Sequence, residues 1–155
     1  MEIRRFQAED ARETAEMIAQ TLRVSNGRDY DEAYIERTIA ALSPDALRER
    51  AKAEHIYVAC ADARIIGCGA IAGYWGSTTE SILLTIFVLP AYQGKGVGTQ
   101  IVRALEQDEF FLRAKRIEIP ASITAVGFYK KLGYADKNGI AAPDAEGHCR
   151  LEKYR

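Results

Sequence analysis

The segment that decides the fold is Gln93-Gly94-Lys95-Gly96-Val97-Gly98-Thr99, which joins an apolar run at 82–89 to a stretch of helical periodicity at 96–113. Its three glycines let the backbone curl so that several N–H groups point to one place. The N-terminus of the following helix adds a partial positive charge there, and Lys95 adds a full charge. The segment therefore predicts a binding site for a phosphate or pyrophosphate group.

The spacing of these glycines does not fit the two best-known nucleotide-binding motifs. A P-loop ends in lysine followed by serine or threonine, and no such pair closes this segment. A Rossmann fingerprint reads G-x-G-x-x-G near the start of its domain, whereas this segment reads G-x-G-x-G past the middle of the chain. A nucleotide-binding module is therefore disfavoured, and a plain strand-to-helix turn open to solvent is the simpler alternative.

Outward from this segment, the hydrophobic pattern predicts a mixture of strands and helices. Strands are expected at 3–6, 56–61, 65–75, 81–89, 116–120 and from 134 onward. Helices are expected at 9–24, 31–42, 44–55, 96–113 and 122–132. The strand at 81–89 is almost entirely apolar, which predicts burial on both faces. This order predicts an α/β (α+β) protein with a mixed sheet and helices on its faces.

Length and charge limit the domain organisation and the kinds of partner that the protein is expected to bind. The 155 residues predict a single domain, 1–155, large enough to fold without disulfides or metal. Lysine and arginine number 21 against 22 aspartate and glutamate residues, so neither a nucleic-acid surface nor an anionic-membrane surface is expected. The sequence has no apolar leader and no apolar run of about 18 residues, which favours a cytoplasmic protein. Cys60, Cys68 and Cys149 form no C-x-x-C pair, so free thiols and no metal site are expected.

Two blocks of the sequence resemble one family. The first is Gln93-Gly94-Lys95-Gly96-Val97-Gly98, which matches the pattern Q/R-x-x-G-x-G/A. The second is Ala125-Val126-Gly127-Phe128-Tyr129-Lys130-Lys131-Leu132-Gly133-Tyr134, which is similar to A-x-x-x-Y-x-x-x-G-[FY]. Both patterns are signatures of the GCN5-related N-acetyltransferases (GNAT). The resemblance implies the GNAT fold, with a mixed central sheet of six to seven strands and about four flanking helices. It also implies an N-acetyltransferase that uses acetyl-CoA as cosubstrate, with direct attack by a primary amine in a ternary complex.

The resemblance also implies where the coenzyme binds. Its pyrophosphate would be held by backbone N–H groups of Gln93, Gly94, Lys95, Gly96, Val97, Gly98 and Thr99. Its pantetheine amides would pair with the backbone of Ile86, Phe87 and Val88, like an added strand. A bulge in that strand would splay it from the next strand and open the slot. The family often has asparagine where this chain has Ser122, which would either cap the following helix or keep a shorter hydrogen bond to the coenzyme.

Acetyl transfer needs a neutral amine, a donor to the oxyanion and a proton for the leaving thiolate. By resemblance, Tyr129 occupies the position of the general acid, and the N–H of Val88 is the oxyanion donor. The base is left open between Glu118 and Glu80, because related enzymes place a base on either of these strands. An exposed or salt-bridged carboxylate is the alternative for both. His148 is suited to base chemistry, although a capping or surface position is the simpler interpretation.

The acceptor is expected across the sheet from the coenzyme, and it would be a small-molecule amine or a peptide. Acidic and aromatic residues at 29–34 would attract a cationic amine, although a solvated helix start also explains them. Tyr74 and Trp75 would form another wall of the pocket, pack at a sheet edge or make a homodimer contact. An acyl-enzyme route through Cys149 is disfavoured. The alternative to an enzyme is a catalytically silent acyl-CoA-binding sensor with the same fold.

Overall fold

The computed structural model describes residues 1–155 and contains one seven-stranded sheet in the order β1-β2-β3-β4-β5-β7-β6. All neighbouring strands are antiparallel except β4 and β5, which are parallel. The strands are β1 (Glu2–Arg5), β2 (His55–Ala61), β3 (Arg64–Gly73), β4 (Glu80–Val88), β5 (Arg116–Ala121), β6 (Ala135–Asp136) and β7 (Cys149–Tyr154). The helices are α1 (Ala11–Thr21), α2 (Glu32–Ala41), α3 (Pro44–Arg50), α4 (Val97–Leu105), α5 (Glu109–Leu112) and α6 (Val126–Lys131). The predicted mixed sheet is confirmed.

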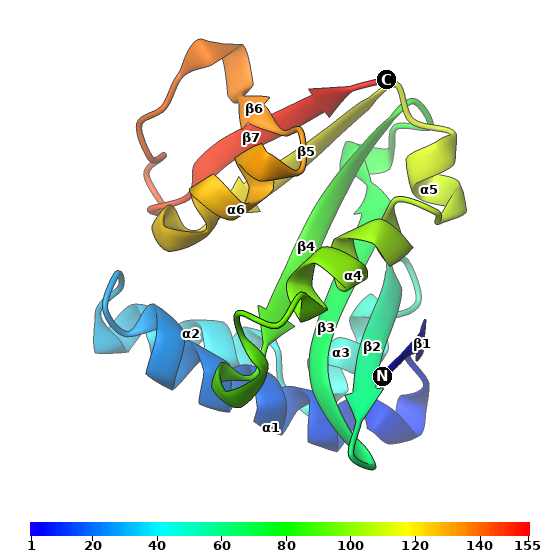
Figure 1. Cartoon of the computed structure of the whole chain (residues 1–155), viewed down its shortest axis with the longest axis vertical. Helices are drawn as coiled ribbons and strands as arrows, with labels where there is room; N and C mark the ends of the chain where they lie inside the picture. The colour runs from blue at the N-terminus through cyan, green and yellow to red at the C-terminus, as the bar shows by residue number, and fades with distance from the viewer.

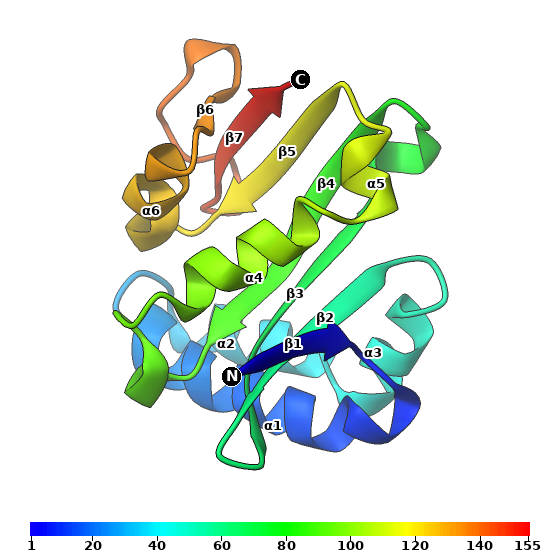
Figure 2. The ribbon, with the colours of Figure 1, turned by 45° about the vertical axis from the view of Figure 1, so that its right-hand side comes forward.

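The helices cover both faces of the sheet. Figure 2 shows α4, α5 and α6 in front of the sheet and α1, α2 and α3 on its other side. Helix α4 lies close to β3 because that strand carries glycine beneath it: a Cβ atom at Gly69 would be 2.7 Å from Ile101 of α4. This close packing holds α4, whose first turn belongs to the glycine-rich segment, against the sheet. None of the helices combines the length and apolar composition that crossing a bilayer requires.

The sheet divides between β4 and β5. The two strands pair only from Glu80 opposite Arg116 to Ile82 opposite Glu118, and they then separate, as Figure 1 shows. On its other edge β4 contains a bulge, because two residues of β4, Thr85 and Ile86, oppose one residue of β3. Thr85 has a φ of 57°, in the left-handed region that a β-branched residue rarely adopts. Its carbonyl accepts a hydrogen bond from the buried Cys68 thiol at 3.2 Å.

The helix predicted at 96–113 is in fact two helices, α4 and α5. The break occurs at Asp108, whose carboxylate caps α5 by accepting a hydrogen bond from the N–H of Phe110 at 2.8 Å. The same carboxylate accepts a hydrogen bond from the Tyr57 hydroxyl at 2.6 Å and lies 2.9 Å from Nδ1 of His55. Both partners come from β2, so a tertiary contact fixes this break.

Two other predicted elements end differently, and a third differs in its burial. The helix at 9–24 stops as α1 at Thr21 and continues as a π-helical turn, Leu22–Asn26. The strand at 65–75 ends at Gly73, because Trp75 adopts a left-handed conformation with a φ of 49°. Burial of the strand at 81–89 on both faces is wrong for its second half. Residues Thr85–Val88 are half-buried because β5 has moved away from them.

Candidate active site

A cleft of about 1240 Å³ opens where β4 separates from β5. Its walls come from the π-helical turn, α2, the second half of β4, the glycine-rich segment, the end of β5 and α6. Because the opening passes between two strands, side chains from both sides of the sheet reach it, for example Tyr34 of α2 and Phe128 of α6. One end of the cleft therefore meets the start of α4, and the other end meets α2.

The glycine-rich segment forms the end of the cleft at α4. Gly94 and Gly96 have φ values of 74° and 83°, which other residues adopt only with strain, and Gly96 is the N-cap of the nine-residue α4. A Cβ atom at Gly98 would lie 3.2 Å from the ring of Phe128, so glycine keeps this wall open. Thr99 also lines the cleft. The free N–H groups of the α4 N-terminus and these bare backbone positions fit a pyrophosphate.

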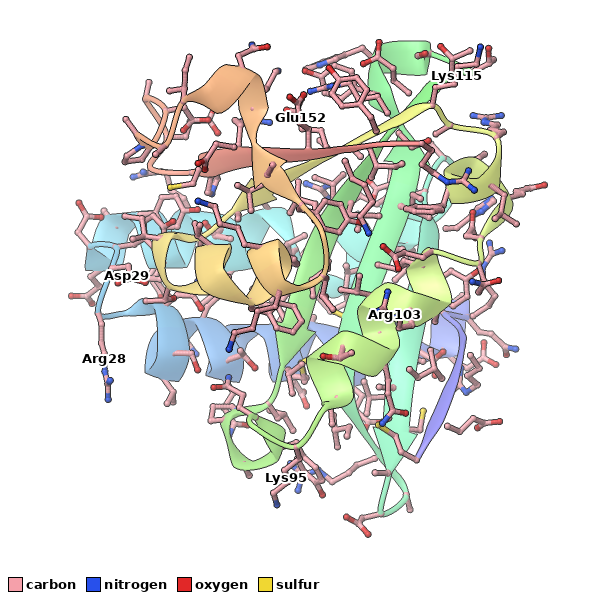
Figure 3. The ribbon with its side chains drawn as sticks, turned by 45° about the horizontal axis from the view of Figure 1, so that its top comes forward. Arg28, Asp29, Lys95, Arg103, Lys115 and Glu152 are labelled. Atoms are coloured by element: carbon pink, nitrogen blue, oxygen red, sulfur yellow. The ribbon has the colours of Figure 1, made fainter.

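Two other residues of this segment, Lys95 and Val97, can face a ligand in the cleft only through their backbone. A third, Gln93, holds the segment in place. The Lys95 side chain extends outward, as Figure 3 shows, and its Nζ lies 5.8 Å from the centre of the Tyr92 ring. The Val97 side chain is buried in the hydrophobic core. The Gln93 side chain donates to the carbonyl of Val88 at 2.8 Å and to the hydroxyl of Ser25 at 2.9 Å. Gln93 therefore ties the segment to β4 and to the π-helical turn.

The backbone of β4 presents alternate residues to the cleft. The N–H of Leu89 bonds to Ile66 of β3, and Phe87 pairs with Cys68 of β3, so these residues direct their polar groups toward β3. The N–H and C=O groups of Val88 and Ile86 then face the gap. The expected pairing of the Phe87 backbone with a ligand does not fit this register. Phe87 lines the cleft instead through its side chain.

Tyr129 and Ser122 both line the cleft from the α6 side. Tyr129 is 5% exposed, and burial raises the pKa of its phenol well above the ordinary value, so the group stays protonated. Ser122 precedes the turn that leads into α6, but its side chain makes no capping hydrogen bond there. The Ser122 hydroxyl is therefore available to a ligand in the cleft.

The two carboxylates expected as bases lie outside the cleft. Glu118 is fully buried, and it accepts hydrogen bonds from Arg116 and from Arg150 at 3.1 Å and pairs with Lys137 at 2.9 Å. Although burial alone would raise the pKa of Glu118, the hydrogen bonds from Arg116 and Lys137 lower it below the ordinary value. Glu80 accepts a hydrogen bond from Arg116 at 2.8 Å. Their partners are cations of the chain, so the geometry favours the salt-bridged alternative for both residues.

A second, smaller hollow of about 550 Å³ lies beside this ion-pair cluster. It is lined by Tyr74, Thr79, Glu80, Lys115, Arg116, Lys137 and Tyr154. Tyr74 places its ring 5.6 Å from the guanidinium of Arg116, while Trp75 is 89% exposed. Tyr74 and Trp75 are therefore not walls of the main cleft.

An aromatic group marks the α2 end of the cleft. The rings of Tyr30 and Tyr34 are stacked with centres 4.3 Å apart, and the hydroxyl of Tyr34 lies 2.7 Å from Nε2 of His148. Burial raises the pKa of Tyr34, so its hydroxyl remains protonated beside the imidazole. Nδ1 of His148 lies 3.9 Å from a carboxylate oxygen of Glu146. His148 thus faces the cleft in a hydrogen-bonded pair, which its position in the sequence did not reveal.

The charges that line the cleft are mainly positive. They belong to Arg28, Arg37, Arg50 and Lys131, against the single acidic residue Glu146. The acidic residues at 29–32 are not among the lining residues, and Asp31 caps α2 by accepting from the N–H of Tyr34 at 2.8 Å. The helix-start interpretation of that segment is therefore the one that the geometry supports. Sequence reasoning missed Arg37, whose only signal is that it follows Tyr34 by one helical turn.

A splayed parallel strand pair, a bulged β4 and a glycine cradle at the start of α4 define a coenzyme A-type acetyltransferase architecture. A family model described as an acetyltransferase (GNAT) domain matches residues 52–136, which is more than half of the chain. The chain belongs to the GNAT family of acetyltransferases, as the two sequence blocks implied.

Solved structures share the whole fold at low sequence identity. PaiA N-acetyltransferase from Thermoplasma acidophilum, in complex with coenzyme A, has a TM-score of 0.84 at 21% identity, over 99% of this chain and 98% of that chain. A GCN5-related N-acetyltransferase structure from Rhodopseudomonas palustris has a TM-score of 0.81 at 23% identity, over 99% and 95%. A GNAT family acetyltransferase from Brucella melitensis, in complex with acetyl-CoA, has a TM-score of 0.67 at 22% identity, over 99% and 86%. No curated protein sequence matches the chain.

Proposed function

We propose that this protein is an N-acetyltransferase that moves the acetyl group of acetyl-CoA to a primary amine by direct attack in a ternary complex. The observation that carries the proposal is the cleft between β4 and β5, with the glycine cradle at one end and the Tyr34–His148 pair at the other. A donor and an acceptor can enter such a cleft from opposite sides of the sheet and meet beside β4. Solved relatives with coenzyme A or acetyl-CoA support the identity of the donor.

The coenzyme would be held mainly by backbone groups. Its pyrophosphate would accept hydrogen bonds from the N–H groups of the segment from Gln93 through Thr99. Its pantetheine arm would pair with the gap-facing backbone of Ile86, as a missing strand between β4 and β5, because the carbonyl of Val88 already accepts from Gln93. Ser122, which lines the cleft from the α6 side, would donate a further hydrogen bond. When bound, acetyl-CoA supplies a thioester whose carbonyl carbon is open to attack by an amine.

The residues of the cleft divide the proton chemistry between its two ends. The N–H of Val88 would donate to the carbonyl oxygen of the acetyl group and stabilise the negative charge that develops there. Tyr129, held in its protonated form by burial, would donate a proton to the departing thiolate. The Tyr34–His148 pair would receive the proton that the amine loses, because the Tyr34 hydroxyl can pass a proton to the imidazole nitrogen with which it is hydrogen-bonded. In this arrangement Glu80 and Glu118 have no catalytic part.

One experiment tests the proposal directly. Isothermal titration with acetyl-CoA measures binding, and a thiol-reactive dye measures release of free coenzyme A in the presence of a panel of primary amines. We expect tight binding and amine-dependent thiol release, with the acetylated amine identified by mass spectrometry. Binding without release for any amine would overturn the transferase proposal in favour of a silent acyl-CoA sensor.

A further inference from the structure

One face of α2 forms the wall of the cleft at the acceptor end. The residues on it are Tyr34 and the three that lie three, four and seven positions after it, Arg37, Thr38 and Ala41. Tyr34 contacts His148, so Arg37 lies about one helical turn from the pair that would handle the amine. Arg37 therefore lines the cleft close to the place where an acceptor would meet Tyr34 and His148.

The four cations of the cleft differ in their surroundings. Arg50 pairs with Glu54 at 3.3 Å, and the other three have no ion-pair partner within the chain. Lys131 belongs to α6, on the side of the sheet that holds the coenzyme cradle. Arg28 follows Ser25, which is bonded to Gln93, and it points toward the same side of the molecule as Lys95 (Figure 3). These two cations suit the phosphates of the coenzyme, whereas Arg37 remains as the unpaired cation at the acceptor end.

On the basis of the proposed function, we infer that the acceptor is an anionic amine, in which a carboxylate or phosphate lies a few bonds from the primary amino group. Arg37 would bind the oxyanion, for which its planar fork of donors is well shaped. Glu146, beside His148, supplies the negative charge on the side where the amine arrives. A polycation such as a polyamine would instead place positive charge against Arg37 with no acidic partner there.

The inference is tested with pairs of acceptors that differ in charge but little in shape. L-methionine is compared with L-methioninamide, O-phosphoethanolamine with ethanolamine, and spermidine represents the polycations. We expect kcat/KM to be roughly tenfold or more higher for the anionic member of at least one pair, as a charge-assisted hydrogen bond implies. The methionine pair tests for recognition of a carboxylate, and the ethanolamine pair tests for recognition of a phosphate. Equal or faster turnover of the amide, ethanolamine and spermidine would overturn the inference and leave the transferase proposal intact.

Variants assign the preference to one side chain. Arg37→Ala and Arg37→Glu should bring the ratio of kcat/KM within the preferred pair close to one, and Arg37→Lys should restore part of it. Arg12→Glu makes the same charge change on an exposed position of α1 outside the cleft, and it should keep the ratio. A ratio is unaffected by partial unfolding, so an unchanged ratio in Arg37→Glu would refute the assignment.

A binding measurement separates this inference from the proposed function. In the presence of coenzyme A, calorimetry compares N-acetyl-L-methionine with N-acetyl-L-methioninamide. If no amine releases thiol, the transferase proposal fails, and binding of the anion that depends on Arg37 would still support the charge preference. Equal binding of the two compounds would overturn it, as would binding of neither together with equal binding of N-acetyl-O-phosphoethanolamine and N-acetylethanolamine.

Discussion

Replacing Glu118 by glutamine separates a structural role of this carboxylate from a catalytic one. The side chain is fully buried, and its two oxygens are shared by Arg116, Lys137 and Arg150. The substitution keeps the shape and removes the charge, and it turns an amide donor toward groups that are themselves donors. Three cations then remain in a cluster whose other anions are Glu80 and Glu152, which pair with Arg116, and Asp144, which pairs with Arg150.

The expected loss in the free energy of unfolding depends on how exposed the ion-pair partners of Glu118 are. Loss of one partner from a buried charge cluster costs about 3–5 kcal/mol. The side chains of Lys137 and Arg150 are 32% and 33% exposed and can turn to water, so we expect the lower end, about 3 kcal/mol. For a chain of this length, each kcal/mol lowers Tm by roughly 2–4 °C, so Glu118→Gln should lower it by about 10 °C at pH 7.

The difference in Tm between the wild type and Glu118→Gln should depend on pH in a definite direction. The pKa of Glu118 is lowered in the folded protein, so its carboxylate stabilises the fold above the ordinary glutamate pKa of 4.5. That contribution is lost as the pH falls through the lowered pKa. The difference in Tm between the two proteins should therefore be constant near neutrality and shrink below about pH 4.5.

The assays are thermal unfolding followed by circular dichroism and thiol release at 20 °C, where the variant remains folded. We expect kcat to stay within about threefold of the wild type. The control is Glu49→Gln, which removes an exposed partner of Lys52 and should shift Tm by no more than about 2 °C. An unchanged Tm would refute the structural argument. A loss of kcat of about a hundredfold with a native spectrum would restore Glu118 as the base.

Three further outcomes are expected. Tyr129→Phe should lower kcat by roughly a hundredfold and leave the Kd for acetyl-CoA within about twofold, and an unchanged kcat would remove its phenol from the chemistry. Gly96→Glu should abolish acetyl-CoA binding in calorimetry. The control is Gly76→Glu, which has a similar φ of 78° and open space around it and should preserve binding. Equal loss of binding in both variants would refute the assignment of the pyrophosphate to the glycine-rich segment. His148→Gln should lower kcat by roughly a hundredfold, as loss of a general base implies, and a wild-type kcat would exclude the imidazole as base.

The sequence was most informative where one short segment carries the chemistry by itself. The segment from Gln93 through Thr99 predicted its own backbone cradle, because glycine conformations and a helix start are local properties. The resemblance of the second block implied a site role for Tyr129, and Tyr129 lines the cleft. The alternation of apolar residues likewise predicted most strands and helices, although Asp108 shows that a helix end can depend on partners from a distant strand.

The rest of the site depended on contacts between segments that are far apart in the sequence. A carboxylate within an apolar strand, such as Glu118, indicates a need for a partner, but the pattern does not say whether that partner is a substrate or Arg116, Lys137 and Arg150. In the same way, the composition of 29–34 suggested an acidic rim, whereas the face of α2 that turns to the cleft carries Arg37. Which face of a helix meets a cavity is decided by packing.

The two halves of the sheet are paired only at one end of β4 and β5. Only three residue pairs join the two halves of the sheet there, and Arg116 links them by bonding to Glu80 of β4, Glu118 of β5 and Glu152 of β7. A small change in the angle between β4 and β5 at this paired end would produce a larger displacement at the open end of the gap, which we call the mouth of the cleft. We therefore expect substitutions around Arg116 to alter the bulk of the acceptor that the mouth admits, while leaving the reacting groups themselves unchanged.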